Sequence, residues 1–185
     1  MRRITSLSPA GYRRVPWKNG GGVTVDIAFD GEIWRFSRTP ITTAGPFSDY
    51  SGYDRLQVLV AGNGLVLETP DGEIDLRRPF QPVRFTGETP ITSRLEAGPV
   101  EVVNLLGERA RVRLDLAVMA AGDTERLGPG LHFAYCPAGQ AVLRLSGKDH
   151  ELAADETLRI EDAEGALATL VAGRVVRGSV ACVSR

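Results

Sequence analysis

The chain has 185 residues, of which 43% are hydrophobic and 24% are charged, a composition typical of a soluble globular protein with one compact core or two small ones. Its formal net charge is −1 and no basic run interrupts that balance, so nucleic-acid and membrane-surface partners are not expected. The N-terminus lacks the apolar stretch of a secretory signal, and no segment approaches the roughly 18 uninterrupted apolar residues of a membrane-spanning helix. Cys136 and Cys182 match no metal or redox spacing, and we interpret both as small buried residues of a cytoplasmic protein.

The first informative segment, RVPWKNGGGVTVDIA at residues 14–28, surrounds three successive glycines with polar side chains. Adjacent glycines cost backbone entropy, so they indicate a positive φ or the close approach of another group. The side chains beside them are Trp17, Lys18, Asn19, Thr24 and Asp26. We expect this segment to form one wall of a binding site, with backbone N–H groups around Gly21 able to form an anion-binding nest. A glycine-rich bulge without ligand is the alternative.

Short segments rich in valine, leucine and isoleucine follow, with glycine, proline, aspartate or asparagine between them. They lie at residues 32–39, 56–62, 64–70, 72–76, 101–107, 111–120, 140–147, 156–162 and 166–173. No window carries a helical stripe, so these closely spaced strands predict an all-β sandwich or barrel. The pattern of LQVLVAGNGLVLETPDGEIDL returns in AVLRLSGKDHELAADETLRIED, which indicates two related β units, residues 1–110 and 111–185.

One stretch follows the spacing of the cupin motif, in which two histidines and a glutamate inside a small jelly-roll barrel bind a metal. The matching positions are Gly45, Ser51, Tyr53, Gln57 and Gly64. Ser51, Tyr53 and Gln57 fall on the ligand positions, and none of them is a good ligand for a divalent transition metal. We therefore expect a barrel without metal or other cofactor, in which Tyr53 and Gln57 line the cavity.

Three segments in order, PWKNGGGVTVDIA, IWRFSRTPITTAGPFSDYSGYDR and LQVLVAGNGLVLE, are similar to the HutD/Ves family, most strongly over residues 14–68. The resemblance implies a cupin-superfamily fold with two jelly-roll halves in one chain. It also implies a place among histidine-utilisation operons, where the family is thought to bind a pathway metabolite and has no firmly attached reaction. Asp26 replaces the usual glutamate, Tyr50 and Ser51 replace Phe-Pro, and Asn104 is kept without the acid of its motif.

The family motifs and the residue chemistry together point to two arginines that could pair with a carboxylate. In the segment 32–39, Arg35 and Ser37 share one face while Trp34 and Phe36 share the other. If the aromatic face packs outside the barrel, Arg35 and Ser37 point into its cavity, and Arg55 is the second candidate. The alternative is a solvated arginine or an internal ion pair, for which the acids are Asp26, Asp49 and Asp54.

The candidate ligand-binding residues are Trp17, Lys18, Asn19, Gly21, Thr24, Asp26, Arg35, Ser37, Phe47, Ser48, Tyr53, Arg55, Gln57 and Asn104. We expect a metal-independent protein that binds a small acidic metabolite, such as an N-acyl amino acid of histidine breakdown, and regulates or buffers histidine utilisation. Two alternatives stay open: a metal-independent isomerase or lyase that uses Asp26 and Lys18 as acid and base, and a protein–protein regulatory module. For the assembly of the protein, we leave a homodimer open.

Overall fold

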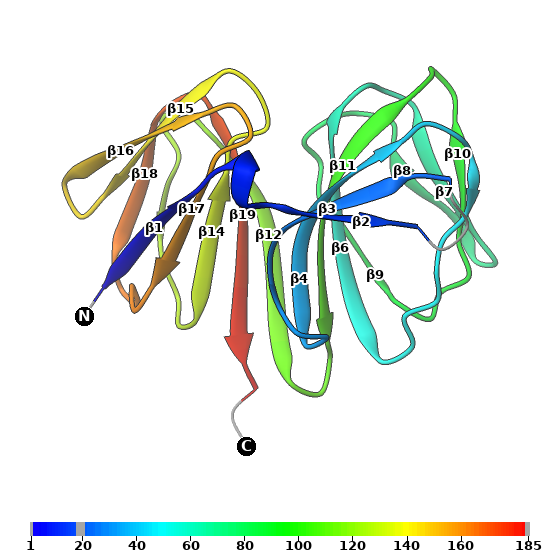
Figure 1. Ribbon diagram of the computed structural model, residues 1–185, viewed down its shortest axis with the longest axis horizontal. Coiled ribbons are helices and arrows are strands. Elements are labelled where there is room, and N and C mark those ends of the chain that lie inside the picture. The colour runs from blue at the N-terminus through cyan, green and yellow to red at the C-terminus, as the bar shows by residue number, and fades with distance from the viewer. Residues whose placement is uncertain (1, 18–20, 184–185) are drawn as a thin grey trace. The chain divides into compact units, whose positions relative to one another are not determined.

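The computed structural model describes residues 2–17 and 21–183, and within these ranges the regular secondary structure is β-strand apart from one short 3-10 helix. The chain divides into two compact units. The N-terminal unit is Arg13–Leu114, and the C-terminal unit joins Met1–Tyr12 to Asp115–Arg185. Each unit contains two antiparallel sheets of its own (Figure 1), which confirms the all-β prediction.

The N-terminal unit packs a six-stranded sheet, in the order β2-β3-β4-β11-β6-β9, against a four-stranded sheet, in the order β5-β10-β7-β8. The strands of the larger sheet are β2 (Arg13–Pro16), β3 (Val23–Asp30), β4 (Trp34–Ile41), β6 (Tyr53–Ala61), β9 (Val83–Thr86) and β11 (Val100–Glu108). Those of the smaller sheet are β5 (Gly45–Pro46), β7 (Leu65–Thr69), β8 (Gly72–Leu76) and β10 (Thr92–Leu95). Leu59 and Val102 of the larger sheet form an apolar core with Leu65 and Leu67 of the smaller one.

The C-terminal unit has a five-stranded sheet, in the order β1-β17-β14-β19-β12, and a four-stranded sheet, in the order β13-β18-β15-β16. The first contains β1 (Arg3–Leu7), β12 (Val112–Ala120), β14 (Leu131–Tyr135), β17 (Thr157–Glu161) and β19 (Arg174–Cys182). The second contains β13 (Thr124–Arg126), β15 (Gln140–Leu145), β16 (Lys148–Ala153) and β18 (Leu167–Ala172), and a short 3-10 helix, η1 (Pro9–Gly11), follows β1. Its apolar core includes Leu143, Leu158, Ile160 and Leu170.

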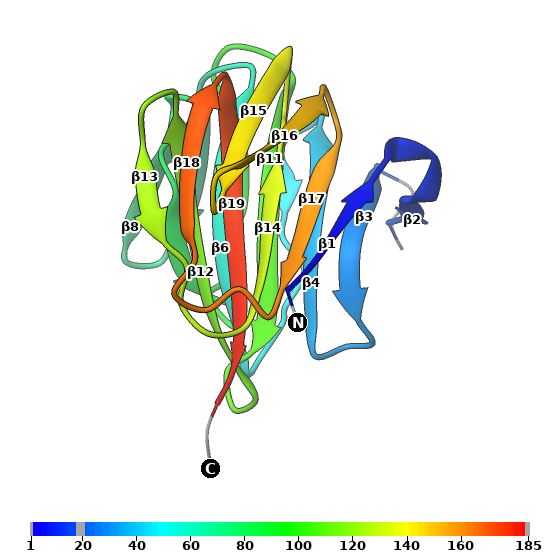
Figure 2. The same cartoon turned by 90° about the vertical axis from the view of Figure 1, so that its left-hand side faces the viewer.

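The N-terminal strand β1 belongs to the sheet formed by the last third of the chain. Figure 2 shows it beside β17, with which it pairs antiparallel. In this pairing Arg3 lies opposite Glu161. The Arg3 side chain donates a hydrogen bond to the Glu161 carboxylate across 158 residues of sequence. The sequence predicts a boundary between the two units after residue 110, whereas the observed boundaries follow residues 12 and 114.

Each unit contains a strand that ends in Val-Ala and is followed directly by a glycine, and the two glycines have similar φ angles. The pairing of β6 with β11 shifts register just before Gly62, and the pairing of β18 with β15 shifts just before Gly173. Their φ angles are +79° and +81°. A Cβ atom would lie 2.6 Å from the Pro99 carbonyl oxygen at Gly62 and 2.2 Å from that of Gln140 at Gly173. Glycine is therefore required beside both bulges for two reasons: the backbone has a positive φ, and a Cβ atom would clash with a carbonyl oxygen.

The two cysteines differ in their surroundings. Cys136 is buried in the C-terminal core, as predicted. Cys182 is the last residue of β19 and is exposed, so the prediction of two buried cysteines is wrong for the second. In the described ranges, no helix has the length and apolar character needed to cross a bilayer.

Replacing Gly173 by alanine should destabilise the protein by about 3 kcal/mol or more, because the left-handed backbone costs roughly 1–2 kcal/mol and the clash with Gln140 adds to it. Gly165 is the matched control, because its φ is +77° but a Cβ there would meet no atom within 4 Å. Gly165→Ala should therefore lose only the conformational part, about 1–2 kcal/mol. Urea denaturation measures both, and equal losses would contradict the steric argument.

Candidate functional site

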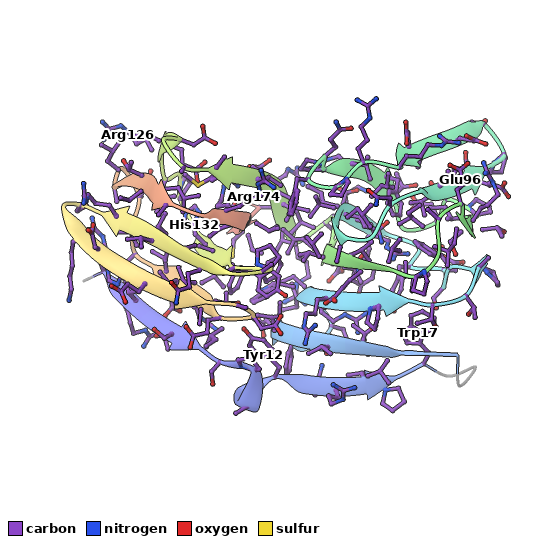
Figure 3. The ribbon with its side chains drawn as sticks, turned by 90° about the horizontal axis from the view of Figure 1, so that it is seen from above. Tyr12, Trp17, Glu96, Arg126, His132 and Arg174 are labelled. Carbon is purple, nitrogen blue, oxygen red and sulfur yellow. The ribbon has the colours of Figure 1, made fainter. Side chains whose placement is uncertain are left out.

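Gly22 directly precedes β3, which pairs antiparallel with β2. The Trp17 amide donates a hydrogen bond of 2.9 Å to the Gly22 carbonyl. The Trp17 ring, marked in Figure 3, packs on Gly22, where a Cβ would lie 3.1 Å from three of the ring carbons. Gly22 does not adopt a left-handed φ, so the close approach of the indole is what requires glycine there. Lys18 and Asn19, two of the predicted site residues, lie outside the described residues.

A chain of hydrogen bonds connects this hairpin to the middle of the six-stranded sheet. The Trp17 indole N–H donates to Thr24 Oγ1 at 3.0 Å, and the Thr39 hydroxyl donates to the same oxygen at 3.3 Å. The amide nitrogen of Asn104 then donates to Thr39 Oγ1 at 3.4 Å. Three of the predicted residues, Trp17, Thr24 and Asn104, therefore lie in one network. Thr39 was missed, although it continues the alternation of Arg35 and Ser37 along the same strand.

Four polar residues form a row across the inner face of the six-stranded sheet. Asp26 of β3 lies opposite Ser37 of β4, Ser37 lies opposite Asn104 of β11, and Asn104 lies opposite Gln57 of β6. Gln57 precedes the core residue Leu59 by two positions and shares its face, so this row faces the four-stranded sheet. We call these four residues the inner row. The prediction that Ser37 turns its side chain toward the interior is confirmed by this register.

The carboxylate of the inner row is held between two arginines. Asp26 is fully buried, and its Oδ2 atom accepts hydrogen bonds from the Arg13 side chain at 2.7 and 3.1 Å. Arg35 Nε lies 3.7 Å from the other oxygen, Oδ1, and an Arg35 terminal nitrogen donates to the Tyr50 hydroxyl at 3.0 Å. The alternative of an internal ion pair thus applies to Arg35. Asp26 is thus an ion-pair partner of both arginines, and this engagement does not favour its use as a catalytic acid or base together with Lys18.

Arg55 has a different environment from Arg35. Its guanidinium carbon lies 4.9 Å from the ring centre of Phe47, 5.2 Å from that of Phe85 and 5.5 Å from that of Tyr50. We call these three rings the aromatic cage. In the described parts of the chain, Arg55 has neither an ion pair nor a hydrogen bond with another side chain. A cation among aromatic faces gains only part of what it loses on leaving water. Arg55 is therefore a partly buried positive charge that has no side-chain counter-ion among the described residues.

The pKa of Arg55 is lowered to about 10, mainly by burial; Tyr50 opposes this shift, and the neighbouring positive charge of Arg35 adds to it. The guanidinium is still protonated at neutral pH. Arg13 and Arg35 flank the carboxylate of Asp26, and Arg55 lies close enough to Arg35 for the two positive charges to repel. A local excess of positive charge among partly buried side chains favours an anion.

Several predicted residues lie away from the inner row. Ser48 and Gly21 are exposed. The Tyr53 hydroxyl donates to the Glu32 carbonyl at 2.8 Å, and its ring borders Tyr50 with the ring centres 6.1 Å apart. Of the three residues on the cupin ligand spacing, Gln57 alone is buried in the inner row, because Ser51 sits in an exposed turn where it donates to Asp49.

Two surface hollows of the N-terminal unit border predicted residues. One is lined in part by Phe47, and the other in part by Tyr53 and Ser51. Phe47 thus contributes to the aromatic cage and also to a surface hollow. Within the described residues, no group of three or more histidine, cysteine, aspartate or glutamate side chains could hold a metal ion.

Besides Thr39, three residues of the site were not predicted, each for a different reason. Arg13 lies on the edge strand β2, and only its pairing opposite Asp26 brings it to the site. Phe85 reaches the aromatic cage because β9 pairs with β6, a partnership that local sequence does not encode. Tyr50 lies in the family motif, and its substitution for phenylalanine was noted without a role. Its hydroxyl now has one, as the acceptor for Arg35.

The buried polar residues of the C-terminal unit include His132 of β14, which Figure 3 marks. Its Nε2 atom lies 2.9 Å from the Gly128 carbonyl oxygen, which makes Nε2 the protonated nitrogen of the neutral ring. Burial lowers the pKa of His132, and Arg177 adds to this effect while Gly128 and Glu125 oppose it. A neutral histidine bonded to the backbone is expected to serve the fold of this unit.

Replacing Arg55 by methionine should raise the thermal midpoint by about 2–6 °C, because the folded protein disfavours the buried cation. The sign follows from the lowered pKa: the charge costs stability in full at every pH below about 10, and the cost shrinks only as the pH rises above that value toward the ordinary pKa of arginine. The exposed Arg78 is the control, and Arg78→Met should leave the midpoint unchanged. Differential scanning calorimetry at pH 7 decides, and a lower midpoint for Arg55→Met would show that the guanidinium stabilises the fold.

Comparison with known proteins identifies the family. The HutD family matches residues 9–176 of this chain. A relative from Pseudomonas putida, described as an uncharacterized 21.2 kDa protein in the hutC 3' region, is 30% identical over 188 residues, which span 94% of this chain and 95% of the relative. A conserved protein of unknown function from Pseudomonas aeruginosa PAO1 has a TM-score of 0.88, and HutD from Pseudomonas fluorescens SBW25 has a TM-score of 0.84. Both structures are 26% identical to this chain, and each match covers 98% of it and 100% of the other chain. The chain therefore belongs to the HutD family.

Proposed function

We propose that this protein binds a small carboxylic acid inside its N-terminal unit, with Arg55 as the group that holds the carboxylate. The observation that carries the proposal is the unpaired guanidinium of Arg55 in its aromatic cage. A protein rarely buries a charge without a partner, and a carboxylate ligand supplies one with a geometry that the arginine fork matches. Arg35 stands in the same interior but is already engaged by Asp26 and Tyr50.

The aromatic cage contributes to this binding in a second way. Phe47, Tyr50 and Phe85 surround the guanidinium with apolar surface, which restricts its rotation and weakens its hydration. A carboxylate that reaches Arg55 therefore meets a cation that is already oriented and partly desolvated. Such preorganisation lowers the entropic cost of binding a small ligand.

The family relationship supports the biological part of the proposal. The HutD family and the relative in the hutC 3' region connect the chain to histidine-utilisation genes. We propose that the acid is a metabolite of histidine breakdown, such as an N-acyl amino acid, and that binding regulates or buffers this pathway. The engagement of Asp26 by two arginines supports binding over the isomerase or lyase alternative.

Titration calorimetry with sodium formate and sodium acetate tests the proposal directly. We expect saturable binding of one anion per chain, with a Kd of about 1 mM for ligands of this size. Arg55→Met should weaken the binding at least about tenfold, the cost of one lost charge-assisted hydrogen bond. Arg78→Met should bind like the unchanged protein. Absence of saturable binding by either anion, or equal binding by Arg55→Met, would contradict the proposal.

The same binding should depend on pH at the alkaline end. Because the pKa of Arg55 is lowered to about 10, acetate affinity should be constant from pH 7 to about 9 and should then fall about tenfold per pH unit above 10. The Tyr50→Phe variant removes the phenol beside the guanidinium and should keep this fall. A flat profile up to pH 11 in both proteins would show that the Arg55 proton is not needed.

A further inference from the structure

The larger of the two surface hollows has a volume of about 520 Å³ and combines apolar walls with negative charge. Its apolar lining residues are Pro46, Phe47, Pro70, Pro90 and Ile91. Its charged lining residues are Asp49, Glu68 and Glu88, and none of the described residues that line it is basic. Ile91 is buried and Phe47 is half-buried, whereas the three acids are exposed. We call this feature the acidic hollow.

The acidic hollow continues onto the outer face of the four-stranded sheet. Pro46 of β5 lies opposite Thr92 of β10, Thr92 lies opposite Glu68 of β7, and Glu68 lies opposite Glu73 of β8. The neighbouring residue Leu67 is in the core, so these four residues, which we call the outer row, face away from it. Strands are about 4.8 Å apart, so the outer row spans about 14 Å. The acidic surface is therefore longer than the hollow, because Glu73 lies beyond its lining.

The ion pairs of this face leave an excess of negative charge. Glu68 and Glu73 stand directly opposite each other, an arrangement of like charges that destabilises a sheet. Arg94 donates to Glu68 at 2.8 Å and to Glu73 at 2.7 Å, and Arg77 donates to Glu73 and to Glu96, marked in Figure 3, at 2.9 Å each. These two guanidinium groups serve four carboxylates, those of Glu68, Glu73, Asp75 and Glu96.

The other two acids of the hollow add to this excess. Asp49 accepts a hydrogen bond from the Ser51 hydroxyl at 2.8 Å and has no ion pair among the described residues. Glu88 pairs with Arg109, but Arg109 also serves Asp54. Each carboxylate oxygen has more than one lone pair, so the acids of the hollow can accept further hydrogen bonds from a cation.

We propose that the acidic hollow and the outer row bind a basic, extended segment of a partner protein, with an arginine side chain of that segment in the hollow. Arginine packs its apolar stem against proline and aromatic surface while its planar guanidinium reaches the exposed carboxylates. Alternate side chains of an extended segment lie about 7 Å apart on one side, so a second arginine reaches Glu73. The charge of this face repels nucleic acids and acidic membranes and is complementary to such a segment. Neither Arg55 nor the inner row takes part.

Two short peptides that differ only in charge test the proposal. Citrulline has nearly the shape of arginine but carries a neutral urea group, so acetyl-Arg-Ala-Arg-amide is compared with acetyl-Cit-Ala-Cit-amide. In an NMR titration of the full chain, the arginine peptide should shift the amide signals of Thr69, Ile91 and Thr92 saturably, with a Kd of about 1 mM. The citrulline peptide should bind about tenfold more weakly, since it lacks both ion pairs. Raising the salt concentration from about 0.05 M to about 0.5 M should weaken the arginine peptide about threefold or more.

Two variants separate the hollow from the outer row. Asp49→Asn removes a charge of the hollow and should weaken both acetyl-Arg-Ala-Arg-amide and the single residue acetyl-arginine-amide about threefold. Glu73→Gln removes the charge beyond the hollow, so it should weaken the longer peptide about threefold and leave acetyl-arginine-amide unchanged. Glu73→Gln leaves Arg77 and Arg94 paired with Glu96 and should not lower the thermal midpoint. Asp30→Asn, an exposed acid outside this surface, is the control and should bind both like the unchanged protein.

Each remaining outcome overturns the proposal. Absence of saturable shifts up to about 10 mM peptide, equal binding of the arginine and citrulline peptides, or shifts confined to residues outside the acidic hollow and the outer row would exclude a basic partner at this surface. Equal affinity for acetyl-arginine-amide and the longer peptide would indicate a site for a small cation instead of a segment. Acetate binding at Arg55 is measured separately, so the proposed function and this inference can fail independently.

Discussion

The antiparallel register of β3, β4, β11 and β6 is the constraint on which the chemistry of the N-terminal unit depends. It places Asp26, Ser37, Asn104 and Gln57 in one line across four strands, although these residues are far apart in the sequence of the unit. Side chains alternate along a strand, so a shift of one residue in one pairing would move a member of the line to the opposite face. Large apolar residues two positions away on the same strands prevent that shift because they must stay in the core: Leu59 lies two residues after Gln57, and Val102 lies two residues before Asn104.

The interior of this unit combines a well-filled apolar part with a poorly satisfied polar part. Leucine, isoleucine and valine side chains from both sheets fill the first. In the second, Arg55 lacks a counter-ion among the described residues, and acceptors of the inner row lack donors. Such local conflicts between sequence and stability are expected where a protein has a function to serve.

Strand alternation and turn chemistry account for what the sequence predicted well. The alternation at residues 32–39 placed Arg35 and Ser37 on one face, and the glycines marked a close approach that proved to be the ring of Trp17. What could not be predicted depends on partners distant in sequence. Arg13 reaches Asp26 through an edge strand, Phe85 reaches Arg55 through β9, and the acids available to each arginine looked equivalent. Spacing alone also misplaced Ser51, because a turn interrupts the strand that the cupin pattern assumed.

The pairing of β1 with β17 has a consequence for how the chain is made. A ribosome releases β1 first, yet its partner strand emerges only when most of the protein has been synthesised, since Arg3 and Glu161 are 158 residues apart. The N-terminal unit, Arg13–Leu114, needs no strand from outside its own range and can close while synthesis continues. During that time β1 is a free edge, and its polar and charged residues, such as Arg3 and Thr5, make it a poor template for association with other chains. The last event in folding is then the return of the first strand to a sheet built by the end of the chain.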